Sequence, residues 1–242
     1  MLDHADSGSL SPQIGNLSFL REINLMNNTI QGEIPRELGR LHRLETLLLS
    51  NNSLVGKIPA NLSYCSKLTV LFLGCNKLVR SIPFEFVSLY RLKQLALHMN
   101  NLTGGIPPFL VNLKSLEVVS LAENSFGGNI PDSLGQLKEL ETLGIGANNL
   151  SDTIPPSIYN LSLLVHFSVS HNQIHGSLPP SLGLTFPNLK IFQINRNFFG
   201  GSIPISLCFK TRNYSNWEKQ FLRKTFSQFW RLEESFIPKF IF

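Results

Sequence analysis

Hydrophobic residues recur along this chain with a step of 24 residues, and polar residues stand between them. Around Gln94 to His98 the apolar and polar residues alternate, which is the pattern of a strand with one buried face. Each period supplies one such strand, so we expect strands from successive periods to stack into a parallel sheet. In one well-defined period the residues expected to point inward are Leu92, Leu95, Leu97, Leu102, Ile106, Leu110 and Leu113.

One asparagine stands at the same place in every period. Seven asparagines follow the 24-residue step strictly, and the eighth comes one residue late, which places an extra residue between Leu182 and Leu189. An asparagine side chain turned into the coil can donate to and accept from backbone groups that a bend leaves unpaired. The sequence therefore predicts a structural asparagine ladder of Asn28, Asn52, Asn76, Asn100, Asn124, Asn148, Asn172 and Asn197.

Glycine and proline mark the turn after each asparagine. Gly104 and its counterparts allow a turn that a Cβ would strain, and the proline of the following Ile-Pro pair ends the segment. Two periods carry Arg80 and Asp152 instead of this glycine. Either these residues are local variation, or they offer a side chain to a partner on the lateral surface.

The consensus LxxLxxLxLxxNxLxGxIPxxLGxL resembles the plant-type leucine-rich repeat, and the stretch SPQIGNLSFLREINLMNNTIQGEIPRELGRL resembles ectodomains of plant receptor-like serine/threonine kinases. Similarity is closest to the subfamily that includes bacterial-elicitor immune receptors, and it covers about residues 7–207. It implies an α/β-type solenoid, a right-handed array of about eight 24-residue repeats with a concave parallel β-sheet.

The resemblance sets the expected domain boundaries. Residues 1–16 are interpreted as a partial first repeat, 17–207 as the leucine-rich-repeat domain, and 208–242 as a basic and aromatic tail without repeats. The tail has three interpretations: a capping segment, a membrane-surface helix, or translated intron or shifted frame. We expect it to be disordered or artefactual.

Several parts of the family pattern are not found in this sequence. Receptors of this kind carry a signal peptide, a paired-cysteine cap, a membrane-spanning helix and a kinase, and we recognise none of them here. The chain has no Gly-rich phosphate loop, V-A-I-K, H-R-D or D-F-G motif. We therefore expect a truncated, non-enzymatic chain that needs no cofactor, with any membrane attachment through a parent receptor's transmembrane segment.

The formal net charge of +5 is concentrated near the C-terminus. Residues 1–204 hold 14 Lys and Arg against 13 Asp and Glu, whereas residues 205–242 hold 7 against 3. A nucleic-acid groove needs basic residues gathered on a folded face. The nearly neutral repeat array therefore argues against nucleic acid as a partner.

Cysteines and histidines give no metal-binding pattern. Cys65, Cys75 and Cys208 are an odd number with no metal spacing, and Cys65 takes a position that is leucine in other repeats. We expect Cys65 to be a small buried residue, and a Cys65–Cys75 disulfide is an open alternative. His166, His171 and His175 share one repeat but lie on a strand end and a turn, so we interpret them as solvated rather than as metal ligands.

The strand positions that face out of the concave sheet are the expected binding surface, because a leucine-rich-repeat solenoid usually binds there. An apolar group on adjacent strands can anchor a peptide; the alternative is that these side chains pack only among themselves. The predicted ligand-binding residues are Leu48, Val70, Phe72, Gln94, His98, Val118 and His166.

Eight N-x-[ST] sequons indicate a glycosylated surface, although asparagine-rich repeats also create such sites by chance. The candidate acceptors are Asn16, Asn27, Asn51, Asn61, Asn101, Asn149, Asn160 and Asn213. Together with the resemblance they favour the extracellular face of the plasma membrane or the apoplast.

The leading hypothesis is a peptide- or protein-binding module, a ligand-sensing ectodomain fragment of a plant receptor-like kinase in signalling or defence, with a co-receptor as a further partner. The alternative is a secreted inhibitor, because polygalacturonase-inhibiting proteins use a similar repeat. Such inhibitors carry disulfide caps, which this sequence does not show.

Overall fold

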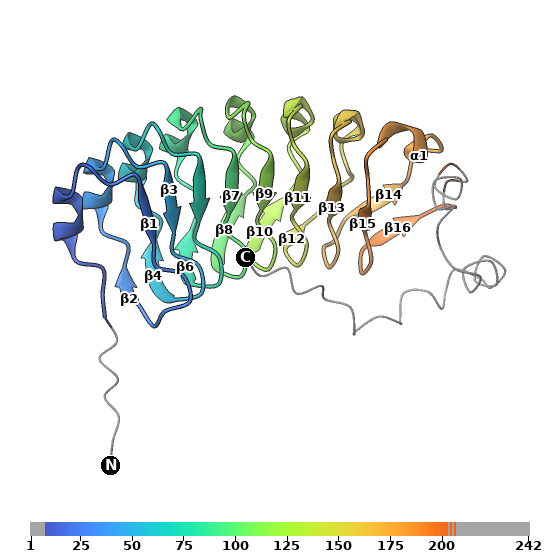
Figure 1. Cartoon of the computed structure of the whole chain (residues 1–242). Coiled ribbons are helices and arrows are strands. Elements are labelled where there is room, and N and C mark those ends of the chain that lie inside the picture. Colours follow the sequence, from blue (N-terminus) through green and yellow to red (C-terminus); the bar gives the residue numbers. More distant parts are fainter. Residues whose placement is uncertain (1–7, 203, 205, 207–242) are drawn as a thin grey trace, which may run out of the picture.

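The computed structural model of the protein describes residues 8–202, 204 and 206. Each repeat forms one coil of a solenoid, with a strand on one side, a second strand on the flank and a short helix opposite the first strand (Figure 1). Residues 208–242, which carry the tail and Asn213, lie outside the described residues.

The first strand of each coil joins the concave sheet, which has eight parallel strands in chain order. Neighbouring strands pair with matched positions, for example Glu22 opposite Thr46. These strands contain three residues each, shorter than the alternation around Gln94 to His98 suggests. The strands are β1 (Glu22–Asn24), β3 (Thr46–Leu48), β5 (Val70–Phe72), β7 (Gln94–Ala96), β9 (Val118–Ser120), β11 (Thr142–Gly144), β13 (His166–Ser168) and β15 (Ile191–Gln193).

A lateral sheet, which the sequence did not reveal, is formed by the second strands. It has six parallel strands, β2 to β12, and two further strands, β14 and β16, pair separately beyond it. The strands are β2 (Gln31–Glu33), β4 (Ser53–Lys57), β6 (Lys77–Arg80), β8 (Asn101–Gly105), β10 (Ser125–Gly128), β12 (Asn149–Leu150), β14 (His175–Ser177) and β16 (Phe198–Gly200).

Short helices cover the side opposite the concave sheet. In six coils a proline is the N-cap residue, because its fixed φ suits the extended cap and it has no N–H to leave unpaired. The 3-10 helices are η1 (Pro12–Asn16), η2 (Arg36–Arg40), η3 (Ala60–Tyr64), η4 (Phe84–Ser88), η5 (Pro108–Asn112), η6 (Asp132–Gln136) and η7 (Pro156–Asn160).

The late eighth repeat differs from the others on this helical side. The α-helix α1 (Leu182–Thr185) replaces the 3-10 helix there, within the segment expected to hold the extra residue. Strand β15 nevertheless pairs with β13 position for position, His166 lying opposite Ile191. The insertion is therefore absorbed without a bulge in the concave sheet.

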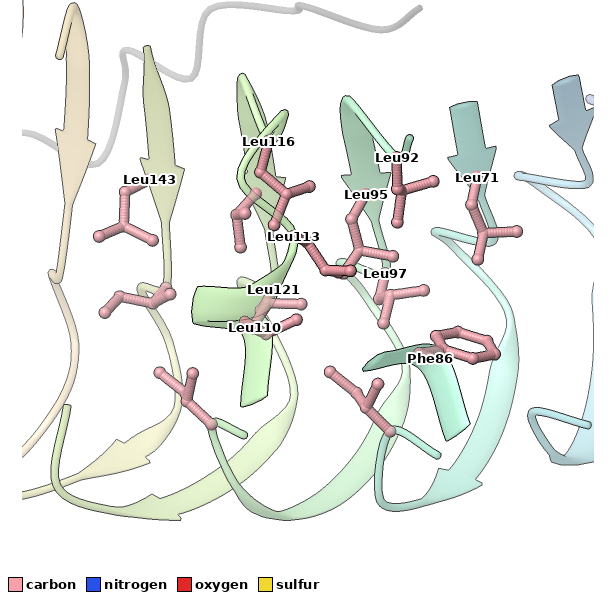
Figure 2. Close-up of a cluster of buried hydrophobic side chains, with 14 of the residues drawn as sticks. Leu71, Phe86, Leu92, Leu95, Leu97, Leu110, Leu113, Leu116, Leu121 and Leu143 are labelled. Carbon is pink, nitrogen blue, oxygen red and sulfur yellow. The ribbon is translucent and has the colours of Figure 1, made fainter. Parts of the chain in front are cut away.

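One continuous hydrophobic core runs along the solenoid from Leu10 to Phe186. Leucines from successive coils meet inside it, with Phe86 filling a leucine position (Figure 2). Each fully buried side chain of this size stabilises the fold by about 1.5–3 kcal/mol. Because a coil's side chains are buried partly by the next coil, the stability is collective.

The asparagine side chains join adjacent coils. The Asn100 amide nitrogen donates to the carbonyl oxygens of Leu73 and Leu97 at 3.0 and 3.1 Å, and its Oδ1 accepts from the Leu78 N–H at 2.9 Å. Asn52, Asn76, Asn124, Asn148, Asn172 and Asn197 make equivalent bonds. Asn28, at the first coil, donates only within its own turn among the described residues.

Two backbone features depend on glycine. Helices of adjacent coils approach closely at Gly39, where an added Cβ would lie 2.3 Å from the backbone oxygen of Asn61. A position of positive φ lies within or just after the second strand, for example Gly56 in β4, and Arg80 and Asp152 adopt it as well, with φ of 71° and 69°. These two residues are therefore held in a conformation that costs a non-glycine residue about 1–2 kcal/mol.

Candidate ligand-binding face

The outward positions of the concave sheet hold the seven predicted ligand-binding residues. All seven are half-buried, because neighbouring strands supply flanking side chains on both sides. Leu48 lies directly opposite Phe72 in the pairing of β3 with β5, and Val70 lies two residues before Phe72 on the same face. We call Leu48, Val70 and Phe72 the apolar group; the structure brings these three together.

Small residues form the floor beside the apolar group. Gly74 and Ala96 are buried on this face. The His98 ring lies against Gly74, since a Cβ added to that glycine would come within 2.6 Å of the ring Cε1. His98 Nδ1 is also 3.3 Å from the Ser120 hydroxyl.

Burial controls the charge of the histidines on this face. Desolvation lowers the pKa of His98 below its ordinary value, although the Glu123 carboxylate opposes the shift. Desolvation likewise lowers the pKa of His166, opposed by a hydrogen bond with the Gln193 side chain. His166 Nε2 is buried with no hydrogen-bond partner among the described residues. Both rings are therefore biased toward the neutral form, which can donate and accept.

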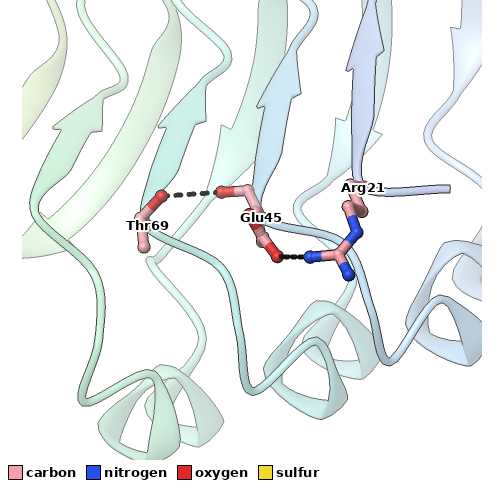
Figure 3. A network of polar contacts seen from close by, with 3 residues as sticks. All are labelled: Arg21, Glu45 and Thr69. Atoms are coloured by element: carbon pink, nitrogen blue, oxygen red, sulfur yellow. Dashed lines mark hydrogen bonds and ion pairs between the residues drawn. The ribbon is translucent and has the colours of Figure 1, made fainter.

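Ion pairs border the concave sheet at the N-terminal ends of its strands. Arg21 contacts Glu45 at 2.6 Å, and the Thr69 hydroxyl donates to the Glu45 carbonyl oxygen at 3.0 Å (Figure 3). Lys93 and Glu117 repeat this arrangement at 2.6 Å. Exposed pairs of this kind contribute about 0–1 kcal/mol, so this edge supplies polarity rather than stability.

The opposite edge carries Cys75, and both described cysteines are free thiols. Cys75 Sγ lies 3.5 Å from Met99 Sδ, whereas buried Cys65 donates to the Leu38 carbonyl oxygen at 3.3 Å. The Cys65–Cys75 disulfide left open by the sequence is therefore not formed. Burial raises the pKa of Cys65 to about 11, as suits an unreactive core thiol.

The described sequons lie outside the concave strands, and two of them lie close to the end of a concave strand. Asn16, Asn61 and Asn160 lie on the 3-10 helices, and Asn101 and Asn149 begin lateral strands. Asn27 and Asn51 follow the concave strands in turns with positive φ, and the Asn51 amide donates to Asn27 Oδ1 at 2.7 Å. Glycans on the 3-10 helices or the lateral strands would leave the concave strands uncovered, whereas glycans at Asn27 or Asn51 would stand at the edge of the concave sheet, three residues after β1 and β3.

Catalytic and metal-binding arrangements are not seen in the described part of the chain. It contains no group of three or more His, Cys, Asp or Glu residues able to hold a metal ion. An open hollow of about 800 Å³ lies on the flank, lined mostly by glycine, serine and proline with Asn129 and Asp132. The Ser133 hydroxyl there donates to the Pro108 carbonyl oxygen at 3.3 Å rather than to a carboxylate.

The sequence profile of the Leucine Rich Repeat family matches residues 19–41, 43–65, 91–113, 115–137, 139–161 and 163–184, more than half of the chain. The chain belongs to the leucine-rich-repeat family. Residues 67–89 fall between the matched segments, yet they form a regular coil with β5, β6 and η4. No curated protein matches the sequence.

Solved structures of similar leucine-rich-repeat proteins include plant receptor ectodomains. The plant peptide hormone receptor RGFR1, in complex with RGF2, is 32% identical with a TM-score of 0.80, covering 83% of this chain and 32% of that one. The Arabidopsis receptor kinase HAESA, in complex with the peptide hormone IDA and the co-receptor SERK1, is 32% identical with a TM-score of 0.79, covering 83% and 34%. The chain thus spans about a third of these receptor chains.

A plant ice-binding protein is also similar, at 31% identity and a TM-score of 0.67, covering 84% of this chain and 73% of that one. The same solenoid therefore occurs in proteins with different ligands. Among the residues that the structure describes, no helix has the length and apolar character to cross a bilayer.

Proposed function

We propose that this chain is a ligand-sensing part of a plant receptor-like kinase ectodomain, of the subfamily that includes immune receptors, and that it binds a peptide or small protein on the concave sheet. The observation that carries the proposal is the apolar group, three half-buried apolar side chains on adjacent strands of a sheet face that nothing in the described chain covers.

Two further observations support this assignment. Five of the seven described sequons lie on the 3-10 helices or the lateral strands, so glycosylation at those five is compatible with ligand binding on the concave sheet. The similar receptor structures contain peptide hormones, and one also contains a co-receptor. The proposal therefore includes a co-receptor as second partner, an extracellular location, and a longer parent receptor with a membrane segment and a kinase.

The mechanism in this proposal is binding without chemistry. An extended peptide would place an apolar side chain over the apolar group, and its backbone could approach the sheet closely at the small residue Ala96, since the His98 ring already covers Gly74. Neutral His98 and His166 would offer hydrogen bonds at the margins. Ligand binding would then bias the parent receptor toward its co-receptor-bound state, because a ligand that contacts both favours their complex.

The test uses a random 12-residue peptide library displayed on phage and selected on the full chain. The enriched peptide is synthesised and titrated against the double variant Leu48→Asp, Phe72→Asp. Its affinity should fall at least about tenfold, since burying one apolar side chain is worth about 1.5–3 kcal/mol. The matched control is Tyr64→Asp, Tyr90→Asp, two exposed aromatic side chains outside the concave sheet, which should keep full affinity.

A folded Leu48→Asp, Phe72→Asp protein with unchanged peptide affinity would remove the apolar group from the site. Inhibition of a fungal pectinase by the chain, without selection of any peptide, would instead favour the polygalacturonase-inhibitor alternative.

A further inference from the structure

A second unpartnered surface lies on the lateral sheet. Strands β4 and β6 pair with Val55 opposite Lys77 and Lys57 opposite Val79, so valines and lysines alternate in both directions. Arg80 follows at the end of β6. We call Val55, Lys57, Lys77, Val79 and Arg80 the lateral cationic patch. All five residues are exposed, the two valines at 39% and 37%.

The three cations have no acidic partner among the described residues. The ion pairs found there involve Arg21, Arg36 and Lys93 only. Glu33, on neighbouring strand β2, is opposite Val55 and its side chain lies over Gly56, and it forms no ion pair with the patch. Lys57, Lys77 and Arg80 outnumber the neighbouring Glu33 carboxylate, so the patch keeps a net positive charge that suits an acidic partner.

Arg80 is an exposed cation that also occupies a strained backbone position. It has φ of 71° where most other coils place glycine. Asp152 stands at the same position with φ of 69°, but its carboxylate accepts the Thr153 N–H at 2.9 Å, which explains it locally. No hydrogen bond or ion pair of the Arg80 side chain is found in the described structure. Unexplained strain at an exposed charge is a feature of binding sites.

We propose that the lateral cationic patch binds an extended, acidic segment of a partner protein. Residues two apart on such a segment face the same side and are about 6.6 Å apart. A segment laid along β4 therefore places one side chain over Val55 and the next over Lys57. The complementary pattern is an aliphatic residue and a carboxylate two positions apart, with a further carboxylate reaching Arg80.

A protein partner fits better than an acidic polysaccharide because the patch includes valines. Exposed valine gains nothing from carboxylates alone, whereas it gains from burial against an aliphatic side chain. Asn101, a sequon residue, pairs opposite Val79. A glycan there would border the patch, so glycosylated and Asn101→Gln protein are both measured.

The probe is an N-acetylated, C-amidated nonapeptide, Glu-Ser-Val-Ser-Glu-Ser-Val-Ser-Glu, titrated against the full chain at low ionic strength. The affinity for the probe should fall on the order of tenfold in Arg80→Gly. It should fall further in the double variant Lys57→Glu/Lys77→Glu, because each substitution removes a positive charge that would face a carboxylate of the probe. Asp152→Gly is the matched control: it relieves the same backbone strain but should keep affinity. Leu48→Asp, Phe72→Asp should also keep affinity, which separates this proposal from the concave site.

Three outcomes would overturn the proposal. One is absence of probe binding to both glycosylated and Asn101→Gln protein. Another is that three proteins bind the probe with equal affinity while circular dichroism shows all of them folded. These are the wild type, the Arg80→Gly variant and the double variant Lys57→Glu/Lys77→Glu. The third is that polygalacturonate, or a probe with serine at both valine positions, binds as tightly as the nonapeptide. The patch would then bind polyanions without specificity for an acidic peptide.

Discussion

The concave and lateral sheets are built from the same coils but differ in continuity. The concave sheet runs unbroken through eight strands, whereas the lateral sheet is interrupted between β12 and β14. Only isolated backbone bonds cross that division, such as the His175 N–H to the Asp152 carbonyl oxygen at 2.9 Å. The lateral sheet is interrupted at the coil of Asp152. It continues past Arg80, although Arg80 has almost the same φ as Asp152.

This difference shows what each sheet depends on. From β3 onward, the asparagine after each concave strand joins two coils and also both sheets. The Asn100 amide donates to the Leu73 carbonyl oxygen, which follows β5, and its Oδ1 accepts the N–H of Leu78 in lateral strand β6. The lateral strands differ in that they contain, or are followed by, a residue of positive φ, which is glycine in most coils and arginine or aspartate in two. The two sheets therefore share the asparagine contacts, and the lateral sheet has in addition a position that accepts residues other than glycine in spite of its positive φ.

The largest effect should come from the core that both sheets share. Phe126, in lateral strand β10, is fully buried. We expect Phe126→Ala to lower the free energy of unfolding by about 3–5 kcal/mol, because it leaves a cavity as well as losing apolar burial. Urea unfolding measures this. Val55→Ala, on the outer face of the same sheet, should cost less than about 0.5 kcal/mol, and comparable losses would contradict the assignment of faces.

Removal of a ladder asparagine should come next. Asn100→Ala leaves the Leu73 and Leu97 carbonyl oxygens and the Leu78 N–H without this partner, and each unpaired buried group costs about 1–3 kcal/mol. Some of these groups keep other contacts, so we expect a loss of about 3 kcal/mol in chemical unfolding. The neighbouring Asn101→Ala, on an exposed side chain, is the control and should be nearly neutral.

The pH dependence should follow the concave histidines. Folding lowers the pKa of His98 and His166 below 6.5, so the unfolded chain binds more protons as the pH falls through that value. Stability should be full above pH 6.5 and decline below it, toward the folded pKa values. The Glu123 carboxylate acts on His98, and the Gln193 side chain hydrogen-bonds to His166. The Tm should fall between pH 7.5 and pH 5.5, and it should fall less in the double variant His98→Gln/His166→Gln than in the wild type. An equal fall in both proteins would refute the assignment of this pH dependence to the two histidines.

The smallest effect concerns the lateral turn. Arg80→Gly relieves the positive φ, although glycine also gives the unfolded chain more freedom. We expect a net gain of about 0.5–1 kcal/mol, seen as a higher Tm. Asp152→Gly should gain less, since it also loses the bond to the Thr153 N–H. A loss of stability in Arg80→Gly would mean that the arginine has an internal role.

Most of the fold could be predicted from the sequence, because a repeated unit repeats its contacts. The period located the concave strands, the asparagine ladder and the insertion near Leu182. The lateral sheet could not be seen: Asn101–Gly105 ends in two glycines and carries no two-residue alternation long enough to recognise. Five-residue 3-10 helices likewise show no helical period.

The candidate site was predicted only as a set of positions. The register placed Leu48 and Phe72 next to each other, as the structure has them. Their half-buried state, the contact of His98 with Gly74 and the buried Nε2 of His166 depend on side-chain packing between coils, which a period does not encode. Whether these residues bind a ligand stays a prediction.

The replacement of a 3-10 helix by α1 shows how such a chain can change in length. One extra residue is taken up on the helical side, while β13 and β15 keep their pairing. The coil thus separates two kinds of evolutionary change: insertions can accumulate at the back, and substitutions can alter the concave face strand by strand. Because insertions on the helical side leave the concave strands in place, single substitutions on that face can change the ligand that is bound without changing the geometry of the sheet.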